Sequence, residues 1–393
     1  METVYLDHSA TTPVHPEVLG AMMTYFAHHF GNASSIHREG RLARQAIEEA
    51  RAQVAALIGA DAAEIVFTGG GTEADNLAIL GAAFAEERGR NHLITSAIEH
   101  HAVENACRHL RKRGFEVTVL PVDGQGRVSP EAVGKAVTDK TLLISIMHAN
   151  NEIGTVEPLR EIGVIARAKG ILLHSDAVQS AGKIPVFVDE LGVDLLSLAG
   201  HKIYGPKGTG ALYVRRGTAL QPITFGGHQE WGLRNGTENV PGVVGLGKAC
   251  QIAARDLNTQ RVHLEGLRDL LAARIREEIP DAHVNGHPTE RLPHLLSVSF
   301  YGVSGEMLVR ELDLRGVAVS AGSACTAGST NISPVLAALG MEEALAVGTL
   351  RFSMGRGNTP DEILRTAALL GKLVRRHRGL PQASDASARG DGR

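Results

Sequence analysis

Residues 64–87 read EIVFTGGGTEADNLAILGAAFAEE, an apolar run, a glycine turn and a helix-like stretch in that order. The same alternation continues along the first two-thirds of the chain. Further strand candidates, several of them apolar almost throughout, are 92–96, 116–122, 141–150, 171–178, 194–199 and 210–216. Continuous apolar runs are typical of strands buried on both faces, and helices such as 159–170, with Gly170 as the expected C-cap, lie between them. The sequence therefore predicts an α/β domain with a mostly parallel sheet flanked by helices.

The pattern changes from about Asn258 onward. A long amphipathic helix (about 259–278), two strand-like runs and a final basic helix follow one another there, which indicates a smaller α+β domain. The polar last residues are typical of a disordered tail. The expected units are a large domain over 16–257, a small domain formed by 1–15 and 258–378 that carries the Cys325 loop, and a tail over 379–393.

The composition of the 393 residues excludes several classes of protein. A net charge of -3 argues against a nucleic-acid partner bound mainly through phosphates. Three cysteines do not make a disulfide framework, which favours a reducing compartment. The N-terminus lacks the basic and apolar regions of a secretory signal, and no apolar run is long enough to span a membrane. We therefore expect a cytoplasmic protein with no membrane partner.

The glycine run in FTGGGTEADN (67–76) predicts an anion site. Backbone N–H groups at the start of a helix point at an anion, and the hydroxyl of Thr72 adds one donor. The pattern is neither a Walker A motif nor GxGxxG, so a single phosphate group fits it better than a dinucleotide. A plain strand–turn–helix junction without a ligand is the alternative.

Two charged residues follow strand candidates of the same domain. Asp176 ends the apolar run in ILLHSDAVQS (171–180), and ligands of open α/β sheets bind beyond the carboxyl ends of strands; a helix N-cap is the alternative. Lys202 follows the strand at 194–199, where burial lowers the pKa of a lysine and allows a Schiff base. A solvated turn lysine is the alternative, with Lys207 as the competing candidate. A phosphate site, a carboxylate and a lysine together match the needs of pyridoxal phosphate.

Cys325 lies among very small residues in SAGSACTAGS (320–329). A structural cysteine usually packs among apolar side chains. The sequence neighbours of Cys325 include no large apolar residue that would hold it in place. We therefore expect a reactive thiol on a loop that moves between two places. Cys107 and Cys250 lie in helical stretches, where an unreactive core or surface position is the expectation.

The motifs also occur in a familiar order. They are YLDHSATT (5–12), SSIHREG (34–40), GGGTEADN (69–76), EHHAV (99–103), HANNEIGTVEP (148–158), HSDAVQ (174–179), GHKIYGPKG (200–208), GGHQEWGLRNGTEN (226–239), SAGSACTAGS (320–329) and RFSMGR (351–356). Over nearly the whole chain apart from the tail, the sequence resembles the NifS/IscS-type cysteine desulfurases. These belong to the class V aminotransferase family of fold-type I pyridoxal-phosphate enzymes.

The resemblance implies a cofactor, pyridoxal 5'-phosphate, and a role for each matching residue. Lys202 would hold the cofactor covalently and move the substrate Cα proton, Asp176 would pair with the pyridine nitrogen, and Cys325 would be the nucleophile. The other implied contacts are Gln179 with the ring hydroxyl, His100 stacked on the ring and acting in acid–base chemistry, Thr72 and His201 with the phosphate, Thr237 with the phosphate of the neighbouring subunit in a homodimer, and Asn151 and Arg351 with the substrate carboxylate. No metal is implied. For Arg351 a structural salt bridge is the alternative.

The implied reaction converts L-cysteine to L-alanine and leaves the sulfur on Cys325 as a persulfide. An acceptor protein for iron–sulfur cluster assembly or tRNA thiolation would then take it. A selenocysteine lyase or another class V aminotransferase is the alternative, and a non-catalytic scaffold is a third. The sequence departs from the family pattern at Ala199, where a phosphate-binding serine is usual, and at His8 and Ala33, where asparagine and proline are commoner. We expect the loss of one hydroxyl donor at Ala199 to weaken cofactor binding somewhat unless a water molecule or Thr72 compensates.

Overall fold

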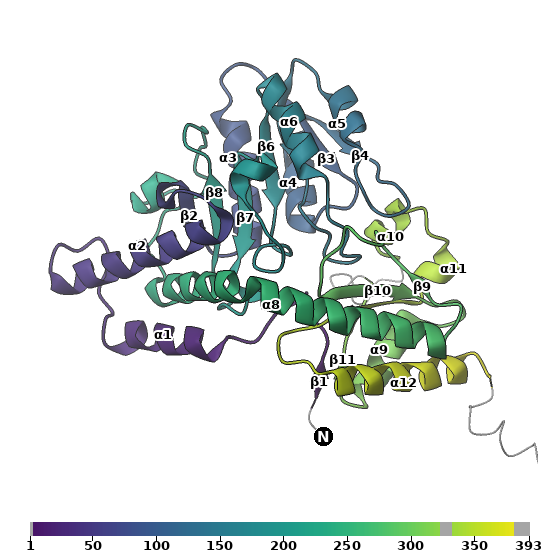
Figure 1. Ribbon diagram of the computed structural model, residues 1–393. Coiled ribbons are helices and arrows are strands. Elements are labelled where there is room, and N and C mark those ends of the chain that lie inside the picture. Colours follow the sequence, from purple (N-terminus) through teal and green to yellow (C-terminus); the bar gives the residue numbers. More distant parts are fainter. Residues whose placement is uncertain (1–2, 323–331, 381–393) are drawn as a thin grey trace, which may run out of the picture.

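A seven-stranded sheet forms the centre of the computed structural model, which describes residues 3–322 and 332–380 (Figure 1). In spatial order its strands are β2 (Ile65–Thr68), β8 (Gly210–Val214), β7 (Leu195–Ala199), β6 (Leu172–Asp176), β5 (Thr141–Ser145), β3 (His92–Ser96) and β4 (Glu116–Leu120). Neighbouring strands are parallel except at β8, which is antiparallel to both β2 and β7. The predicted mostly parallel α/β sheet is therefore confirmed, and each of its strands lies within an expected strand segment.

Helices cover both faces of this sheet. Successive strand residues point to opposite faces, so Leu93 and Leu195 pack against one layer and their neighbours Ile94 and Leu196 against the other. The first layer consists of α3 (Gly71–Ala85) and α4 (His101–Arg111), and the second of α1 (Pro16–Ala27), α2 (Arg38–Ile58), α5 (Pro130–Ala136), α6 (Leu159–Lys169) and the start of α8 (Val240–Glu278). Gly170 caps α6 in the left-handed conformation, as expected.

The chain after α8 forms a second layered region together with the N-terminus. Its antiparallel sheet has the order β12 (Ser320–Ala321), β13 (Thr349–Ser353), β10 (Leu295–Ser299) and β9 (His283–Val284), and the strand β1 (Val4–Tyr5) pairs in parallel with β11 (Val317–Ala318). Helices α9 (Gly305–Asp313) and α12 (Pro360–His377) cover it. The remaining elements are α7 (Val188–Leu191), α10 (Pro334–Ala338), α11 (Glu343–Ala346) and the 3-10 turns η1 (Ala62–Glu64), η2 (Gly200–Lys202) and η3 (Gln229–Gly232).

Helix α8 is much longer than the 259–278 expected, because it already begins at Val240. Its first turns contain glycines, which disfavour a helix in isolation, but here they permit close packing. A Cβ atom at Gly245 would lie 2.6 Å from the sulfur of Met22, and one at Gly247 would lie 2.6 Å from the Cα of Ala50. Tertiary packing against α1 and α2 therefore outweighs the local propensity.

The long helix α8 runs from the large sheet to the second layered region (Figure 1). Residues of α8 up to Ala253 belong to the cluster under the large sheet, and those from Leu264 belong to the cluster of the second region. The helix is continuous through the expected boundary at 257/258. The division into a large and a small domain stays a prediction, and the tail from 381 onward lies outside the described residues.

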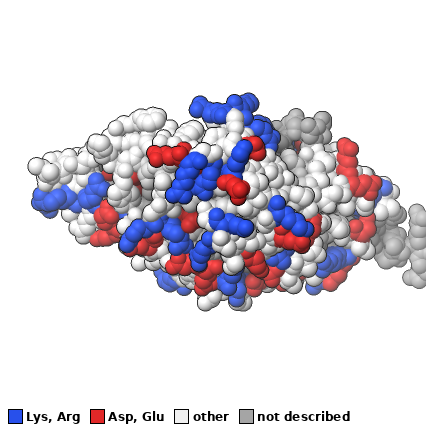
Figure 2. All heavy atoms as spheres, turned by 90° about the horizontal axis from the view of Figure 1, so that it is seen from above, with Lys and Arg blue, Asp and Glu red and all other residues white. Residues whose placement is uncertain are grey.

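The surface and the helices show no membrane-spanning feature in the part of the chain that is described. Figure 2 shows Lys and Arg interspersed with Asp and Glu over one face of the molecule. Within residues 3–322 and 332–380, every helix is too short or too polar to cross a bilayer.

Candidate active site

The carboxyl ends of two adjacent strands bring the predicted lysine and aspartate together. Asp176 is the last residue of β6, and Lys202 ends the turn η2 that directly follows β7. Both line a cavity of about 370 Å³. The other predicted site residues that line it are Thr72, His100, Asn151, Gln179, His201 and Arg351. Residues from far apart in the sequence, such as Thr72 and Arg351, thus meet at the sheet edge where ligands of open α/β sheets bind.

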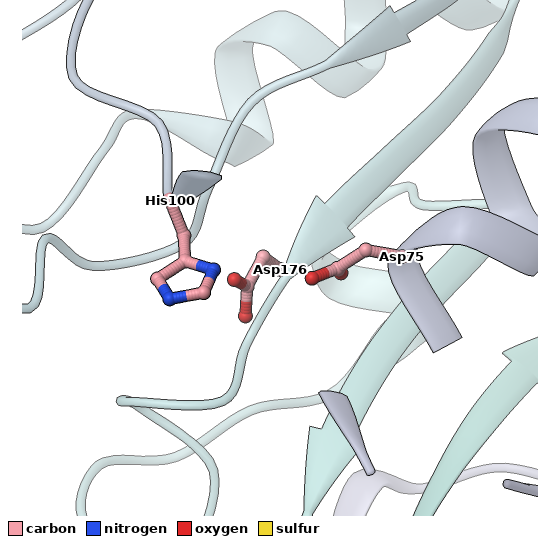
Figure 3. Close-up of side chains that lie close together, drawn as sticks. All are labelled: Asp75, His100 and Asp176. Carbon is pink, nitrogen blue, oxygen red and sulfur yellow. The ribbon is translucent and has the colours of Figure 1, made fainter. Parts of the chain in front are cut away.

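Asp176 lies between His100 and Asp75 (Figure 3). The nearest ligand atoms of the three side chains all lie within 4.8 Å of one another, and the Asp176 Oδ1 accepts a hydrogen bond from the N–H of Val178 at 2.8 Å. Burial raises the pKa of Asp176, while the nearby His100 and Lys202 oppose this shift. The His174 Nε2 lies 3.6 Å from Asp75, but burial lowers the pKa of His174 to about 3, so that ring is neutral. Burial followed by the charge of Asp176 raises the pKa of Asp75 well above the usual range. The single negative charge of the pair is therefore favoured on Asp176.

His100 caps helix α4 and faces the same cavity. Its Nδ1 accepts the N–H of Ala102 at 3.2 Å, which fixes the ring. Burial lowers the pKa of His100, so the ring is neutral and has Nε2 available. Two carboxyl groups and an imidazole would also suit a divalent cation, but the lysine and the glycine-lined anion site in the same place favour an organic phosphate.

Lys202 is oriented by the N-terminal segment of the chain. Its Nζ donates to the carbonyl oxygens of Ser9, at 2.6 Å, and Ala10, at 2.8 Å. The Gln179 Nε2 donates to the same Ser9 oxygen at 2.9 Å. Lys207 is exposed, faces a different cavity and does not meet Asp176. The geometry therefore favours Lys202 as the reactive amine.

The glycine turn before α3 forms one end of the site. Gly70 has φ 149° and gives the helix no side-chain cap, so its N-terminal N–H groups are open to an anion. A Cβ atom at Gly71 would lie 2.7 Å from Val178, which explains glycine there. The exposed Thr72 and the His201 ring adjoin this turn. These donors fit a phosphate group, although the buried Ala199 at the end of β7 contributes no hydroxyl.

Arg351 lies opposite the large sheet, on β13, and is only 3% exposed. Its Nη2 donates to Asp7 Oδ1 at 2.9 Å and to Ser320 Oγ at 3.3 Å, and its Nη1 donates to the Asn151 carbonyl oxygen at 2.9 Å. The salt bridge left open by the sequence is therefore present, and a substrate carboxylate would share Arg351 with Asp7. The Asn151 contact with Arg351 uses the backbone.

Sequence reasoning missed Asp75, Asp7, Lys183 and the Ser9 carbonyl. Asp75 had a usable signal, because it stands three residues after Thr72 on the same helix and thus shares its face. Asp7 lies within the YLDHSATT motif, but nothing in the sequence pairs it with Arg351. Backbone carbonyls carry no sequence signal at all.

Two predicted site residues are not brought into the cavity by the described chain. Thr237 is exposed in the segment after η3 and does not line the cavity. Cys325 lies outside the described residues. Cys107 and Cys250 are buried in α4 and α8, and burial raises the pKa of each thiol to about 12, which confirms unreactive core positions.

The two other departures from the family pattern, His8 and Ala33, are both buried. The His8 ring packs so closely on Gly355 that a Cβ atom there would lie 2.2 Å from its Nε2. Burial lowers the pKa of His8 to about 4. The ring therefore fills space as a neutral group.

Comparisons with known proteins agree with this site. The family model described as aminotransferase class-V matches residues 4–365. A relative named cysteine desulfurase IscS, from Dictyoglomus turgidum, is 49% identical over 375 residues, covering 95% of each chain. A solved structure described as a NifS-like protein superposes with a TM-score of 0.89 at 37% identity, over 95% of this chain and 99% of the other. Another, described as SspA in complex with cysteine, has a TM-score of 0.79 at 40% identity, over 90% of this chain and 99% of that one. The chain therefore belongs to the class-V aminotransferase family and, within it, to the NifS/IscS-type cysteine desulfurases.

Proposed function

We propose that this protein is a pyridoxal-phosphate-dependent cysteine desulfurase that converts L-cysteine to L-alanine and retains the sulfur on Cys325. The observation that carries this proposal is the meeting of Lys202, Asp176 and the glycine-lined turn before α3 around one cavity. The solved relative that is described as a complex with cysteine supports L-cysteine as the substrate.

The residues present fit pyridoxal phosphate. The open N–H groups at the start of α3, with Thr72 and His201, would hold the phosphate. Lys202 would bind the aldehyde carbon covalently, and Asp176 would pair with the ring nitrogen. His100 and Gln179 would contact the ring face and the ring hydroxyl. When bound, the cofactor withdraws electrons from the Cα of the amino acid.

The chain's own groups would then position the substrate and move its proton. Arg351 would bind the substrate carboxylate with two parallel hydrogen bonds, beside Asn151. The Lys202 Nζ would take the Cα proton, held in place by the Ser9 and Ala10 carbonyls. The neutral His100 ring would exchange a proton through its Nε2.

Sulfur transfer would depend on Cys325. Its thiolate Sγ would attack the sulfur of the substrate, so that one S–S bond forms as the substrate C–S bond breaks. The carbon that loses the sulfur takes up a proton and leaves as alanine, and Cys325 keeps a persulfide. We propose that an acceptor protein, of an iron–sulfur scaffold or a tRNA-thiolation pathway, takes this sulfur in the cytoplasm.

A homodimer is part of the proposal. The exposed Thr237 lies outside its own chain's cavity, which is the position expected of a residue that binds the phosphate in a second copy. A monomer in solution that retains full activity would contradict this part.

The test is incubation of the purified protein with pyridoxal phosphate, L-cysteine and a reductant, followed by measurement of alanine and sulfide. Wild type should form both in equal amounts. The variant Cys325→Ser should bind the cofactor but form no protein persulfide, and Lys202→Ala should form no alanine. A keto acid in place of alanine would identify an aminotransferase, and preference for selenocysteine would identify a lyase for that substrate. A protein that takes up no pyridoxal phosphate would contradict every enzymatic alternative.

A further inference from the structure

Lys183 is a buried lysine close to the site but outside its cavity. It is 9% exposed and lies just after the strand end that carries Asp176. Within the ranges 3–322 and 332–380, no carboxylate forms an ion pair with it. The charged groups near it are Lys202 and Arg351, and the histidines His8 and His294 lie nearby. Lysines are seldom buried without a partner, so this position calls for a reason.

Its hydrogen bond leads directly into the site. The Lys183 Nζ donates to Gln179 Oε1 at 3.3 Å, and Gln179 Nε2 donates to the Ser9 carbonyl oxygen at 2.9 Å. That carbonyl is the oxygen that also accepts from the Lys202 Nζ. The two lysines are therefore joined through one amide and one backbone carbonyl.

This arrangement fixes the Gln179 side chain. A carbonyl oxygen accepts hydrogen bonds only, so Ser9 selects the Nε2 end of the amide. The Oε1 end then faces Lys183, which satisfies it in the protein interior. Without that donor, the buried Oε1 would remain unpaired, and the amide would lose one of its two anchors.

The surroundings of Lys183 separate it from the reacting groups. It lines a second, smaller cavity of about 30 Å³, whose lining includes His8, His294 and Lys202. The His8 and His294 Nδ1 atoms there are buried and have no partner among the described residues, and the volume suits one water molecule. Lys202 lines both cavities, whereas Lys183 lines only the smaller one.

We propose that Lys183 is a positioning residue that holds the Gln179 amide with its Nε2 toward the Ser9 carbonyl and the cofactor site. The inference rests on the proposed function, in which Gln179 contacts the ring hydroxyl of pyridoxal phosphate. Burial and the two cations lower the pKa of Lys183 well below its usual value, but an amine donates in either charge state.

The test is a double-mutant cycle of Lys183→Met and Gln179→Ala, read on the affinity for pyridoxal phosphate and on the pH midpoint of the bound cofactor's visible absorbance. Each single variant should weaken binding by about tenfold, because each breaks the same anchored amide. The double variant should bind pyridoxal phosphate with the same affinity as the single variant that binds it less tightly. Both single variants should shift the pH midpoint of the absorbance in the same direction, and the double variant should shift it no further.

Two further variants serve as controls. Lys183→Arg, which keeps a hydrogen-bond donor, should recover most of the affinity for pyridoxal phosphate. Lys372→Met, on an exposed lysine of α12, is the matched control.

Two outcomes would overturn the inference. Effects that multiply in the double variant, to about a hundredfold, would show that Lys183 acts independently of Gln179. An unchanged midpoint in Lys183→Met would show a purely structural lysine. The same cycle on the thermal midpoint of the cofactor-free protein tests the contact without the cofactor. If wild type bound no pyridoxal phosphate, the proposed function would fail, while this stability cycle would still decide whether the two side chains are linked.

Discussion

The two walls of the site cavity differ in how their charged groups are partnered. On the wall formed by the large sheet, the buried Asp176 and Asp75 and the half-buried His100 lie close together with shifted pKa values and few hydrogen bonds. On the opposite wall, Arg351 already binds Asp7, Ser320 and Asn151. The difference indicates that the polar groups of the first wall gain their partners only from a bound ligand. On the second wall Arg351 already has protein partners, so a substrate carboxylate must share it with Asp7.

The largest effect is expected on the sheet wall, for Asp176→Asn. Loss of the carboxylate beside the ring nitrogen should lower kcat/KM for L-cysteine by about a hundredfold, because a preorganised charge at the reacting group is lost. Steady-state alanine formation measures this. Asp75→Asn is the control, since Asp75 carries the proton of the pair and its neutral replacement should cost less than about tenfold. Equal losses in both variants would contradict the assigned difference between the two carboxyl groups.

The next prediction concerns pH and Glu99, which lies beside His100. Its Oε1 accepts from Ser96 Oγ at 2.6 Å and from the N–H of Met147 at 3.0 Å, and burial raises its pKa from 4.5 to about 8. A raised pKa in the folded protein contributes stability that is full below pH 4.5 and lost as the pH rises through about 8. Between pH 6 and 9, wild type should therefore lose about 2 kcal/mol more of unfolding free energy than Glu99→Gln. Urea unfolding at both pH values tests this, and parallel losses would refute it.

On the opposite wall we predict a moderate effect from Asp7→Asn. The substitution removes the anion that competes for Arg351, so the KM for L-cysteine should fall by about fivefold. Arg351→Lys provides the reference, because a lysine cannot bind a carboxylate with two parallel hydrogen bonds, and its KM should rise by about tenfold. If Asp7→Asn instead raised KM, Asp7 would act by orienting Arg351 rather than by competing with the substrate.

The smallest effect is expected at the phosphate end, for Ala199→Ser. A hydroxyl at the end of β7 adds one donor near the glycine turn and should tighten pyridoxal phosphate binding by about threefold. Equilibrium titration of the cofactor-free protein measures it, with Ala199→Gly as a control that adds no donor. Unchanged affinity in the serine variant would mean that Thr72, His201 and the N–H groups of α3 already satisfy the phosphate.

Much of the fold could be predicted because its signals are local. A predicted strand segment matches every strand of the large sheet, and several of these segments are apolar almost throughout. Gly170 marks the end of α6. The first half of α8 was missed, because its glycines disfavour a helix locally and their fit against Met22 and Ala50 exists only in the folded structure. The antiparallel direction of β8 likewise depends on the path of the chain rather than on its residues.

The site residues likewise fall into those with a local sequence signal and those without one. Lys202, Asp176 and Thr72 stand at strand ends and a helix start, so chain order alone predicts that they meet. Asp7, Lys183 and Asp75 acquire their importance from neighbours far away in the sequence. The Ser9 carbonyl, which receives both Lys202 and Gln179, belongs to the backbone and is the same in any sequence.

The length of α8 has a thermodynamic consequence. One helix supplies packing surface to both apolar clusters, with residues such as Val243, Leu246 and Ile252 in one and Leu264 and Leu271 in the other. If either cluster melted, half of the helix would lose its burial, and a helix exposed to water over so many residues is marginal. The two regions should therefore unfold in a single cooperative calorimetric transition, with no populated state in which one is folded and the other is not.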